Sequence, residues 1–320
     1  MKAIRVQTFG GPESMQVADV PQPAPAEDEA VIKVMAAGVN PVDTYIRGGI
    51  YPRLPEPPYT PGTDAAGTVA VIGKSVTGIK EGDRVYCAGC PKGTYAQYIV
   101  CPVDRIHPLP EAIDFLEGAC LGVPGGASWR ALFQRGMAKA GETVLIHGAS
   151  GAVGLSAVQL AYAAGLKVFG TASTPKGLEL ISKLGSTEVF DHGNAKYVDA
   201  IKAATKDKGV DLIVEMLANA NLEKDLDLLA PHGRVVVIGS RGRIEFDPRA
   251  TMGKETDIRG MSLFNATPAE VAQIHAALIG AMKAGFYKPL VSAEYPLAQA
   301  PEAHQQVLKS GNCGNIVLIP

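Results

Sequence analysis

A glycine-rich turn is the clearest chemical signal in the sequence. It follows the apolar run Glu142-Thr143-Val144-Leu145-Ile146 and opens an apolar-striped segment, with Gly148, Gly151 and Gly154 spaced three residues apart. Glycine lets the chain turn tightly, lets a phosphate approach the backbone amides and lets the next helix pack closely on the strand. The positive N-terminal end of that helix attracts the same anionic group. The turn predicts a dinucleotide site, and a close-packed turn without a ligand is the alternative.

The end of the next strand indicates which dinucleotide is bound. NAD-selective sites usually place an acid there, about twenty residues after the turn, to accept the ribose hydroxyls. The sequence at this point is Thr171-Ala172-Ser173-Thr174-Pro175-Lys176 and contains no acid. A hydroxyl-rich turn with a nearby cation suits a 2′-phosphate, which favours NADPH and makes Lys176 a candidate contact. The alternative for Lys176 is an ordinary solvated lysine at a helix start.

The second half of the chain supplies the elements that position this turn. Short Val/Ile/Leu runs alternate there with amphipathic stretches, which predicts an α/β fold with a doubly wound parallel sheet of Rossmann type. The expected strands are Thr143–His147, Lys167–Thr171, Glu188–Phe190, Val210–Glu215, Arg234–Gly239 and Ile258–Leu263. The expected helices are Ala152–Ala164, Lys176–Leu184, Val198–Lys206, Leu222–Ala230 and Pro268–Ala284.

The first part of the chain has a different sequence pattern. Fourteen of the 23 prolines lie in the first 122 residues, among short β-type runs such as Ala30–Ala36, Gly67–Ile72, Asp83–Cys87 and Tyr95–Val100. Proline confined to edges and turns is typical of an irregular β unit. The C-terminal segment from Lys288 again has this pattern of short β-type runs and turns. We therefore expect a β-rich domain of residues 1–122 and 265–320, and a dinucleotide domain of residues 123–264.

Composition limits the possible partners and location. The 30 basic and 32 acidic residues give a net charge of −2, which argues against a nucleic-acid or anionic-lipid surface as the main site. Five cysteines are few and odd in number, as in proteins of a reducing compartment, so we expect a cytoplasmic protein. The longest apolar stretch, Ala152 to Leu166, is too short to span a bilayer.

The residues do not predict a metal site. Catalytic zinc needs three ligands from Cys, His, Asp or Glu and an open position. No histidine occurs before His107, although the β-rich domain is where such a site would be built. The close pair Cys87 and Cys90 lacks a second pair at a zinc-finger interval, and two buried thiols beside a turn are the simpler interpretation. We expect metal-free chemistry.

Several further runs resemble one protein family from end to end. They are Phe9-Gly10-Gly11-Pro12-Glu13, Ala37 through Arg47, Tyr59 through Gly67, His147 through Gly154, Glu215 through Asn219 and Gly239-Ser240-Arg241-Gly242. In this order they resemble the zinc-independent, zeta-crystallin-like NADPH:quinone oxidoreductases of the medium-chain dehydrogenase/reductase superfamily. The resemblance implies a GroES-like β domain beside the Rossmann domain. In zinc-dependent relatives the segment matching Gly38-Val39-Asn40 carries a metal-binding cysteine, and the one matching Gly62-Thr63-Asp64 carries a histidine and a glutamate. Asn40 and Thr63 stand there instead.

The resemblance also implies which residues line the cofactor and the substrate. Asn40 and Tyr45 are expected to act on the substrate in an interdomain cleft, donating hydrogen bonds to a quinone oxygen opposite the nicotinamide. The cofactor-lining residues implied are Tyr45, Ser150, Gly151, Ala152, Val153, Ser173, His192, Asn221, Ile238, Gly239, Ser240, Arg241, Met261, Ser262 and Leu263.

Two departures from the family pattern concern the cofactor. Ser173 stands where relatives often have glycine, and Asn315 stands where they often have a lysine. The missing cation makes us expect only a modest preference for NADPH over NADH. The family also implies a dimer or tetramer, and the Ile258–Leu263 run, last in the sheet, would be protected by pairing with a second copy.

The expected function is therefore NADPH-dependent quinone reduction without a metal, by hydride or electron transfer. A reductase of unsaturated aldehydes or ketones is the alternative among enzymes, and the sequence does not separate the two. A non-catalytic dinucleotide-binding protein with a structural or RNA-binding role is the alternative from another class. The net charge of −2 and the lack of an interleaved basic and aromatic motif argue against RNA binding.

Overall fold

The computed structural model describes all residues 1–320, which form two compact units. Unit 1 contains Met1–Pro124 and Met282–Pro320, and unit 2 contains Gly125–Ala281. No helix in the chain is both long and apolar enough to cross a membrane.

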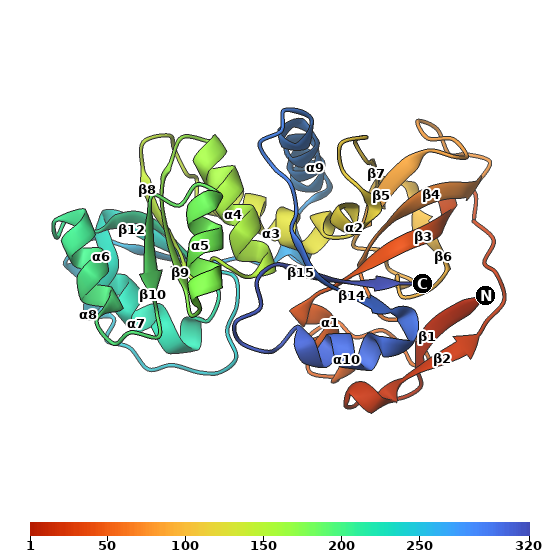
Figure 1. The fold of residues 1–320 in the computed structure, drawn as a ribbon, viewed down its shortest axis with the longest axis horizontal. Helices are drawn as coiled ribbons and strands as arrows, with labels where there is room; N and C mark the ends of the chain where they lie inside the picture. The colour runs from red at the N-terminus through yellow and green to blue at the C-terminus, as the bar shows by residue number, and fades with distance from the viewer. The chain divides into compact units, whose positions relative to one another are not determined.

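Unit 2 is built on one parallel sheet with helices on both faces. Its strands lie in the order β10-β9-β8-β11-β12-β13, which is 3-2-1-4-5-6 in chain order, as in a Rossmann sheet. Figure 1 shows α4 and α5 on one face and α6 and α7 on the other. The strands are β8 Thr143–Ile146, β9 Lys167–Ala172, β10 Glu188–Asp191, β11 Val210–Glu215, β12 Leu229–Val237 and β13 Asp257–Gly260. The helices are α3 Gly126–Trp129, α4 Ala152–Ala163, α5 Pro175–Lys183, α6 Tyr197–Thr205, α7 Ala218–Leu228, α8 Arg249–Met252 and α9 Pro268–Lys283.

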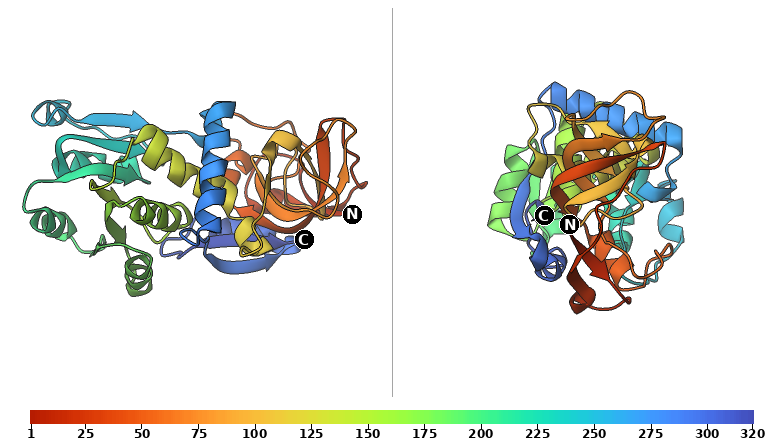
Figure 2. Two further views of the ribbon diagram at one scale, coloured as in Figure 1. Left: turned by 90° about the horizontal axis from the view of Figure 1, so that it is seen from above. Right: turned by 90° about the vertical axis from the view of Figure 1, so that its right-hand side faces the viewer.

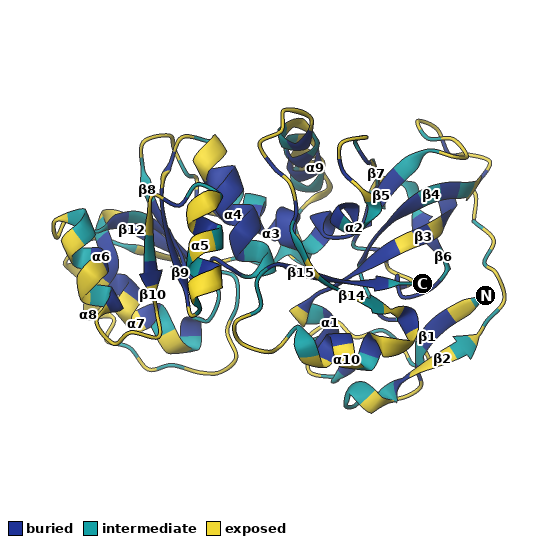
Figure 3. Cartoon of the chain, in the orientation of Figure 1, coloured by how far each residue is buried: buried dark blue, intermediate teal, exposed yellow.

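The apolar strands make the core of unit 2. Burial of apolar surface stabilises such strands, and because both faces are covered their sequences are continuously apolar. In Figure 3, β9 is dark blue over most of its length, whereas the outer face of α5 is exposed, and β8 is likewise buried after its first residue. The predicted parallel sheet and its α/β class are confirmed. The β12 strand begins earlier than expected, and β13 ends at Gly260 rather than at Leu263.

Unit 1 is β-rich. Its main sheet runs β14-β15-β3-β4-β5-β7, with β6 also paired to β3, and β1 and β2 form a separate hairpin. Figure 2 shows the blue C-terminal strands beside the red and orange N-terminal ones, where β15 pairs antiparallel with β3. The strands are β1 Lys2–Val6, β2 Met15–Asp19, β3 Glu29–Val39, β4 Asp64–Ile72, β5 Arg84–Ala88, β6 Tyr98–Pro102, β7 Ile106–Pro108, β14 Val291–Pro296 and β15 Asn315–Ile319. The helices are α1 Pro41–Arg47, α2 Phe115–Gly118 and α10 Ala300–Gln306.

The second boundary between the units differs from the expected one. The sequence places it at residue 265, whereas most of α9, through Ala281, belongs to unit 2. Polar contacts explain the difference: Arg130 forms an ion pair of 3.0 Å with Glu270, and the side-chain amide of Gln134 donates to the carbonyl oxygen of Glu270. Ile274 on α9 also lies beside Gly126 of α3.

Candidate cofactor site

The turn between β8 and α4 has the shape that the glycine spacing predicts. Gly148 has a left-handed backbone with φ of +56°, a conformation that favours glycine. Its N–H donates to Thr171 Oγ1 at 3.1 Å, and the N–H of Ala149 donates to the carbonyl oxygen of Thr171 at 2.8 Å. The turn is thereby tied to the carboxyl end of β9.

The N-terminus of α4 offers hydrogen-bond donors to a phosphate. Gly151 is the N-cap residue and supplies no side-chain acceptor for the first N–H groups of the helix. A Cβ built on Gly151 would meet only one neighbouring atom, the Gly148 oxygen at 3.4 Å, so the space beside it is open. A Cβ on Gly154 would instead lie 2.5 Å from Ala149 Cα, so it would clash with the turn on which α4 packs. The residues therefore fit a pyrophosphate beside Gly151.

The end of β9 carries the predicted hydroxyl-rich turn. Ser173 and Lys176 are exposed just beyond the strand, and Thr174 caps α5 by accepting a hydrogen bond from the N–H of Gly177 at 3.1 Å. The structure therefore places Ser173 and Lys176 near the carboxyl edge of the sheet, where ligands of such folds gather. Contact of either residue with the cofactor stays a prediction.

The ends of β10, β11 and β12 bring the other predicted cofactor residues to the same edge. His192 follows β10, and its Nδ1 lies 3.1 Å from Thr171 Oγ1. The side-chain oxygen of Asn219 accepts from the Arg241 N–H at 2.8 Å and so holds the loop after β12. The sequence places Asn219 in a run that resembles the family but indicates no role for it, because that role depends on a loop 22 residues away. The half-buried or exposed members of this loop and of the segment after β13 are Ile238, Gly239, Ser240, Met261, Ser262 and Leu263.

Asn221 has a structural partner instead of an open side chain. Its amide donates to Glu215 Oε1 at 3.2 Å, and the N–H of Leu217 donates to the same oxygen. Glu215 thus fixes the start of α7 beneath the edge. A cofactor contact of Asn221 stays a prediction.

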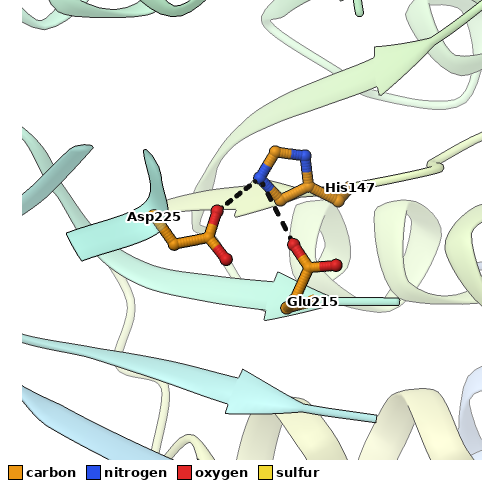
Figure 4. A group of neighbouring side chains, drawn as sticks. All are labelled: His147, Glu215 and Asp225. Carbon is orange, nitrogen blue, oxygen red and sulfur yellow. Dashed lines mark hydrogen bonds and ion pairs between the residues drawn. The ribbon is translucent and has the colours of Figure 1, made fainter. Parts of the chain in front are cut away.

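A buried cluster lies directly behind the glycine turn (Figure 4). His147 Nε2 lies 2.8 Å from Asp225 Oδ1 and 3.6 Å from Glu215 Oε2, and both carboxyl side chains are fully buried. Burial raises the pKa of Glu215 and that of Asp225 to about 7 each, and it lowers the pKa of His147. The imidazole is therefore neutral near pH 7. Sequence reasoning missed this cluster, and no short motif could have shown it.

The same three side chains have ligand atoms close enough to hold a cation, all within 4.8 Å of one another. The short hydrogen bond between His147 and Asp225 uses the imidazole nitrogen that would have to bind the metal. Glu215 and Asp225 also interact through a side-chain hydrogen bond, which fits two buried carboxyl groups that share a proton. Hydrogen bonds and a shared proton therefore explain this cluster more simply than a bound cation does.

In unit 1 the structure gives Asn40 a clear structural role. Asn40 is 3% exposed and precedes α1, and its backbone N–H is bound by Asp43 Oδ2 at 2.8 Å. Its side-chain amide donates to Asp64 Oδ2 at 3.0 Å. Tyr45, four residues into the helix, is half-buried. The predicted catalytic roles of Asn40 and Tyr45 stay predictions.

A chain of buried polar groups continues from Asp43. The Tyr95 hydroxyl lies 3.2 Å from Asp43 Oδ2 and 3.1 Å from His304 Nε2, and Arg47 Nη1 lies 3.2 Å from His304 Nδ1. Burial raises the pKa of Asp43 to about 7, and burial together with Arg47 lowers that of His304 to about 3. His304 is therefore neutral at every physiological pH and packs as a structural residue.

The residues at the zinc-ligand positions of zinc-dependent relatives do not fit a zinc ion. Asn40 and Thr63 stand there, and the Asn40 amide is already bound to Asp64. Asp64 also accepts the N–H of Val123 at 2.7 Å, and burial raises its pKa to about 6. An amide and a hydroxyl are not zinc ligands of the usual kind.

The cysteines beside this region are structural. All five are free, and Cys87, Cys90 and Cys101 are buried together. The neighbouring Cys101 thiol and burial raise the pKa of Cys90. A buried thiol with a raised pKa is a poor nucleophile.

Comparison with known proteins identifies the family. Family models match residues 26–111 as an alcohol dehydrogenase GroES-like domain and residues 152–279 as a zinc-binding dehydrogenase. The quinone oxidoreductase of Rattus norvegicus is 49% identical over 321 residues, which cover 100% of this chain and 98% of that protein. The chain belongs to the quinone oxidoreductase family of the medium-chain dehydrogenase/reductase superfamily. The resemblance read from the sequence is confirmed.

Two solved structures of this family carry the cofactor expected from the sequence. Escherichia coli quinone oxidoreductase complexed with NADPH is 31% identical, with a TM-score of 0.89 and full coverage of both chains. A mycobacterial protein complexed with NADPH is also 31% identical, with a TM-score of 0.91 and full coverage of both chains. The family confirms the expected oxidoreductase class and NADPH as its cofactor.

Replacing Gly151 with valine should abolish cofactor binding without unfolding the protein. The backbone at Gly151 has φ of −74°, which valine can adopt, but the branched side chain would fill the open space where a phosphate approaches the helix. We expect the NADPH dissociation constant to rise about a hundredfold or more, as for the loss of about 3 kcal/mol of binding. Isothermal titration measures it.

Gly253→Val is the matched control, because a Cβ there meets nothing within 4 Å and the residue lies far along the chain from the turn. It should bind NADPH as the unchanged protein does. A Gly151→Val protein with normal affinity and a normal melting curve would remove the turn from the cofactor site.

Proposed function

We propose that this chain reduces quinones with NADPH in a reaction that needs no metal ion. The observation that carries the proposal is the open glycine turn with uncapped helix donors, in a chain 49% identical over its whole length to a quinone oxidoreductase. When bound, NADPH supplies a hydride. The chain supplies the binding and the orientation of that cofactor.

Different segments of this site bind different parts of the cofactor. The N–H groups at the start of α4 face the pyrophosphate, and the acid-free end of β9 leaves room for a 2′-phosphate near Ser173 and Lys176. Asn315, in place of a lysine, is 4% exposed and its amide donates to the Leu290 carbonyl oxygen at 2.8 Å. It is therefore a structural residue of β15, and the preference for NADPH is expected to be modest.

A quinone suits a site without a Lewis acid, because it accepts electrons readily. The developing negative charge on its oxygen needs only hydrogen-bond donors, for which Tyr45 is the half-buried candidate. Asn40 contributes indirectly in this proposal, since its amide already holds Asp64.

Steady-state oxidation of NADPH against a panel of substrates tests the proposal. The panel contains ortho-quinones, para-quinones and unsaturated aldehydes, each assayed before and after exhaustive chelation and with NADH in place of NADPH. We expect quinones to be reduced fastest, at rates that chelation does not change, with NADPH bound several-fold more tightly than NADH.

Other outcomes of the panel identify the alternatives. Faster turnover of unsaturated aldehydes would favour an enal or enone reductase. Tight NADPH binding with no turnover of any substrate would favour a structural or RNA-binding protein. Activity lost on chelation and restored by zinc would overturn the metal-free mechanism.

Replacing Tyr45 with phenylalanine separates quinone reduction from enone reduction. A quinone oxygen gains one hydrogen bond from the hydroxyl, so we expect kcat with quinones to fall only several-fold. An enone reductase that uses Tyr45 as its proton donor would lose roughly a thousandfold, about 4 kcal/mol of barrier. Tyr162→Phe, on the exposed face of α4, is the matched control. No change at all in Tyr45→Phe would remove the residue from the site.

We also propose a homo-oligomer formed through β13. This strand pairs with β12 on one side and is the last of its sheet, and Ile258 on it is 38% exposed. An open strand edge invites pairing, and pairing with a second copy would protect it. Light scattering should find a dimer or tetramer, and Ile258→Lys should shift it towards monomer, whereas Val71→Lys on the exposed face of β4 should not. A wild-type monomer at micromolar concentration would contradict this proposal.

The cytoplasmic location stays a prediction, with which the five free cysteines agree. The absence of nucleic-acid binding likewise stays a prediction.

A further inference from the structure

Four polar side chains form a continuous line along the carboxyl edge of the unit 2 sheet. The line begins at buried Asp225 on α7, passes through His147 and Thr171, and ends at exposed His192. The distances are 2.8 Å from Asp225 Oδ1 to His147 Nε2, 3.5 Å from His147 Nδ1 to Thr171 Oγ1 and 3.1 Å from Thr171 Oγ1 to His192 Nδ1. Each of the three strands β8, β9 and β10 therefore contributes one member at its end.

Thr171 decides the direction of this line, because its hydroxyl has one proton and two lone pairs. One lone pair accepts the backbone N–H of Gly148 at 3.1 Å, a donor that cannot be reversed. The single hydroxyl proton can serve only one of the two imidazole Nδ1 atoms. If it is donated to one histidine, the other histidine must donate its own Nδ1 proton to Thr171.

The carboxyl groups around His147 decide which histidine donates a proton from Nδ1 to the Thr171 hydroxyl. Its Nε2 faces oxygen atoms of two buried carboxyl groups, Asp225 at 2.8 Å and Glu215 at 3.6 Å. Above the pKa of about 7 that burial gives Asp225, its carboxylate can only accept, so Nε2 of the neutral His147 ring carries the proton and Nδ1 has none. That Nδ1 then accepts the Thr171 hydroxyl, and His192 donates from Nδ1.

We propose that Asp225 is a positioning residue that fixes the tautomer of His192 through His147 and Thr171, so that His192 presents an unprotonated Nε2 to the cofactor. The part concerning the cofactor rests on the proposed function, in which His192 lines the dinucleotide site. An unprotonated Nε2 is an acceptor, so the chemical group that it selects is a donor, a sugar hydroxyl of the nucleotide. A phosphate oxygen, which only accepts, is disfavoured there.

The tautomers can be measured directly in the protein without cofactor. Long-range ¹H–¹⁵N correlation spectra of protein labelled at its six histidines distinguish a protonated from an unprotonated ring nitrogen. The spectra are recorded near pH 8, above the ordinary histidine pKa of about 6.5, and His192→Gln and His147→Gln assign the signals. We expect His147 protonated at Nε2 and His192 protonated at Nδ1. A wild-type His192 protonated at Nε2 would overturn the proposal.

Asp225→Asn tests whether the acid is the cause. An amide at this position can donate to His147 Nε2, which moves the His147 proton to Nδ1 and reverses both hydrogen bonds at Thr171. We expect the His192 signal to move towards the Nε2–H form. Asp227→Asn, on the exposed face of the same helix α7, is the matched control and should leave both spectra unchanged. An unchanged His192 in Asp225→Asn would overturn the proposal.

Variants of Thr171 test whether its hydroxyl links His147 to His192. They also provide a second test if Asp225→Asn fails to fold. Thr171→Val removes the hydroxyl at nearly the same volume and should release His192 towards the Nε2–H form that solvated histidine prefers. Thr171→Ser keeps the hydroxyl and should restore the wild-type spectrum. An identical His192 signal in the wild type, Thr171→Val and Thr171→Ser would overturn the proposal, because the Thr171 hydroxyl would then have no effect on the His192 tautomer.

Cofactor titration of the same variants separates this inference from the proposed function. We expect Asp225→Asn and Thr171→Val to raise the NADPH dissociation constant about three- to tenfold, the range of one hydrogen bond. Shifted spectra with unchanged affinity would support the relay and remove His192 from the proposed cofactor site. Weakened affinity with an unshifted His192 would overturn the relay and leave the cofactor site in place.

A metal analysis of the wild-type protein completes the test. One equivalent of divalent metal on His147, Glu215 and Asp225 would overturn the proposal, since a metal-bound His147 Nε2 has no proton. A metal-free protein whose His147 spectrum does not respond to added Zn²⁺ would support it.

Discussion

The closeness of α4 to the turn after β8 is the constraint on which the cofactor site depends. Gly154 lies so near this turn that a Cβ would be 2.5 Å from both Ala149 Cα and the Gly148 oxygen. A larger residue would push the helix away, because backbone atoms cannot move aside as a side chain can. The close contact brings the uncapped N-terminus of α4 to the strand ends, where Gly151 leaves space. Gly154 thus allows the close packing of α4, while the space beside Gly151 stays open.

This edge of the sheet is also held from behind by buried polar groups. Glu215 fixes the first turn of α7 through the Leu217 N–H and the Asn221 amide, and Asp225 from the same helix holds His147 at 2.8 Å. An unpaired buried polar group costs about 1–3 kcal/mol, so each side chain is constrained to the orientation that satisfies its neighbours. The residues at this edge of the sheet therefore stand on a rigid polar layer.

The sequence predicted those features that depend on local spacing. The glycine turn, the six parallel strands and the acid-free end of β9 are visible in short windows because side-chain periodicity and glycine content are local. The His147 and Asp225 contact joins residues 78 positions apart, so no window contains it. The helical run from Phe115 to Arg135 was missed because Gly122, Pro124, Gly125 and Gly126 interrupt its pattern, and the structure accommodates Pro124 in a π-helical turn. Asn40 was read as an open donor because burial is not visible in sequence.

Asn40 and Asp64 join separate segments of unit 1 through hydrogen bonds. The Asn40 amide binds Asp64, and Asp64 also accepts the N–H of Val123, so three segments are joined through one carboxyl group. A Cβ on Gly122 would lie 2.2 Å from Asp64 Oδ1, so that residue must be glycine for the carboxyl to fit. Because burial raises the pKa of Asp64 to about 6, this junction is a carboxylate above that pH and an acid below it. Both N–H groups are accepted by the same oxygen, Asp64 Oδ2, so a proton on Oδ1 leaves both hydrogen bonds in place. Since burial raises the pKa above its ordinary value of 3.8, the folded protein favours the neutral acid, and the stability that this junction contributes falls as pH rises through about 6.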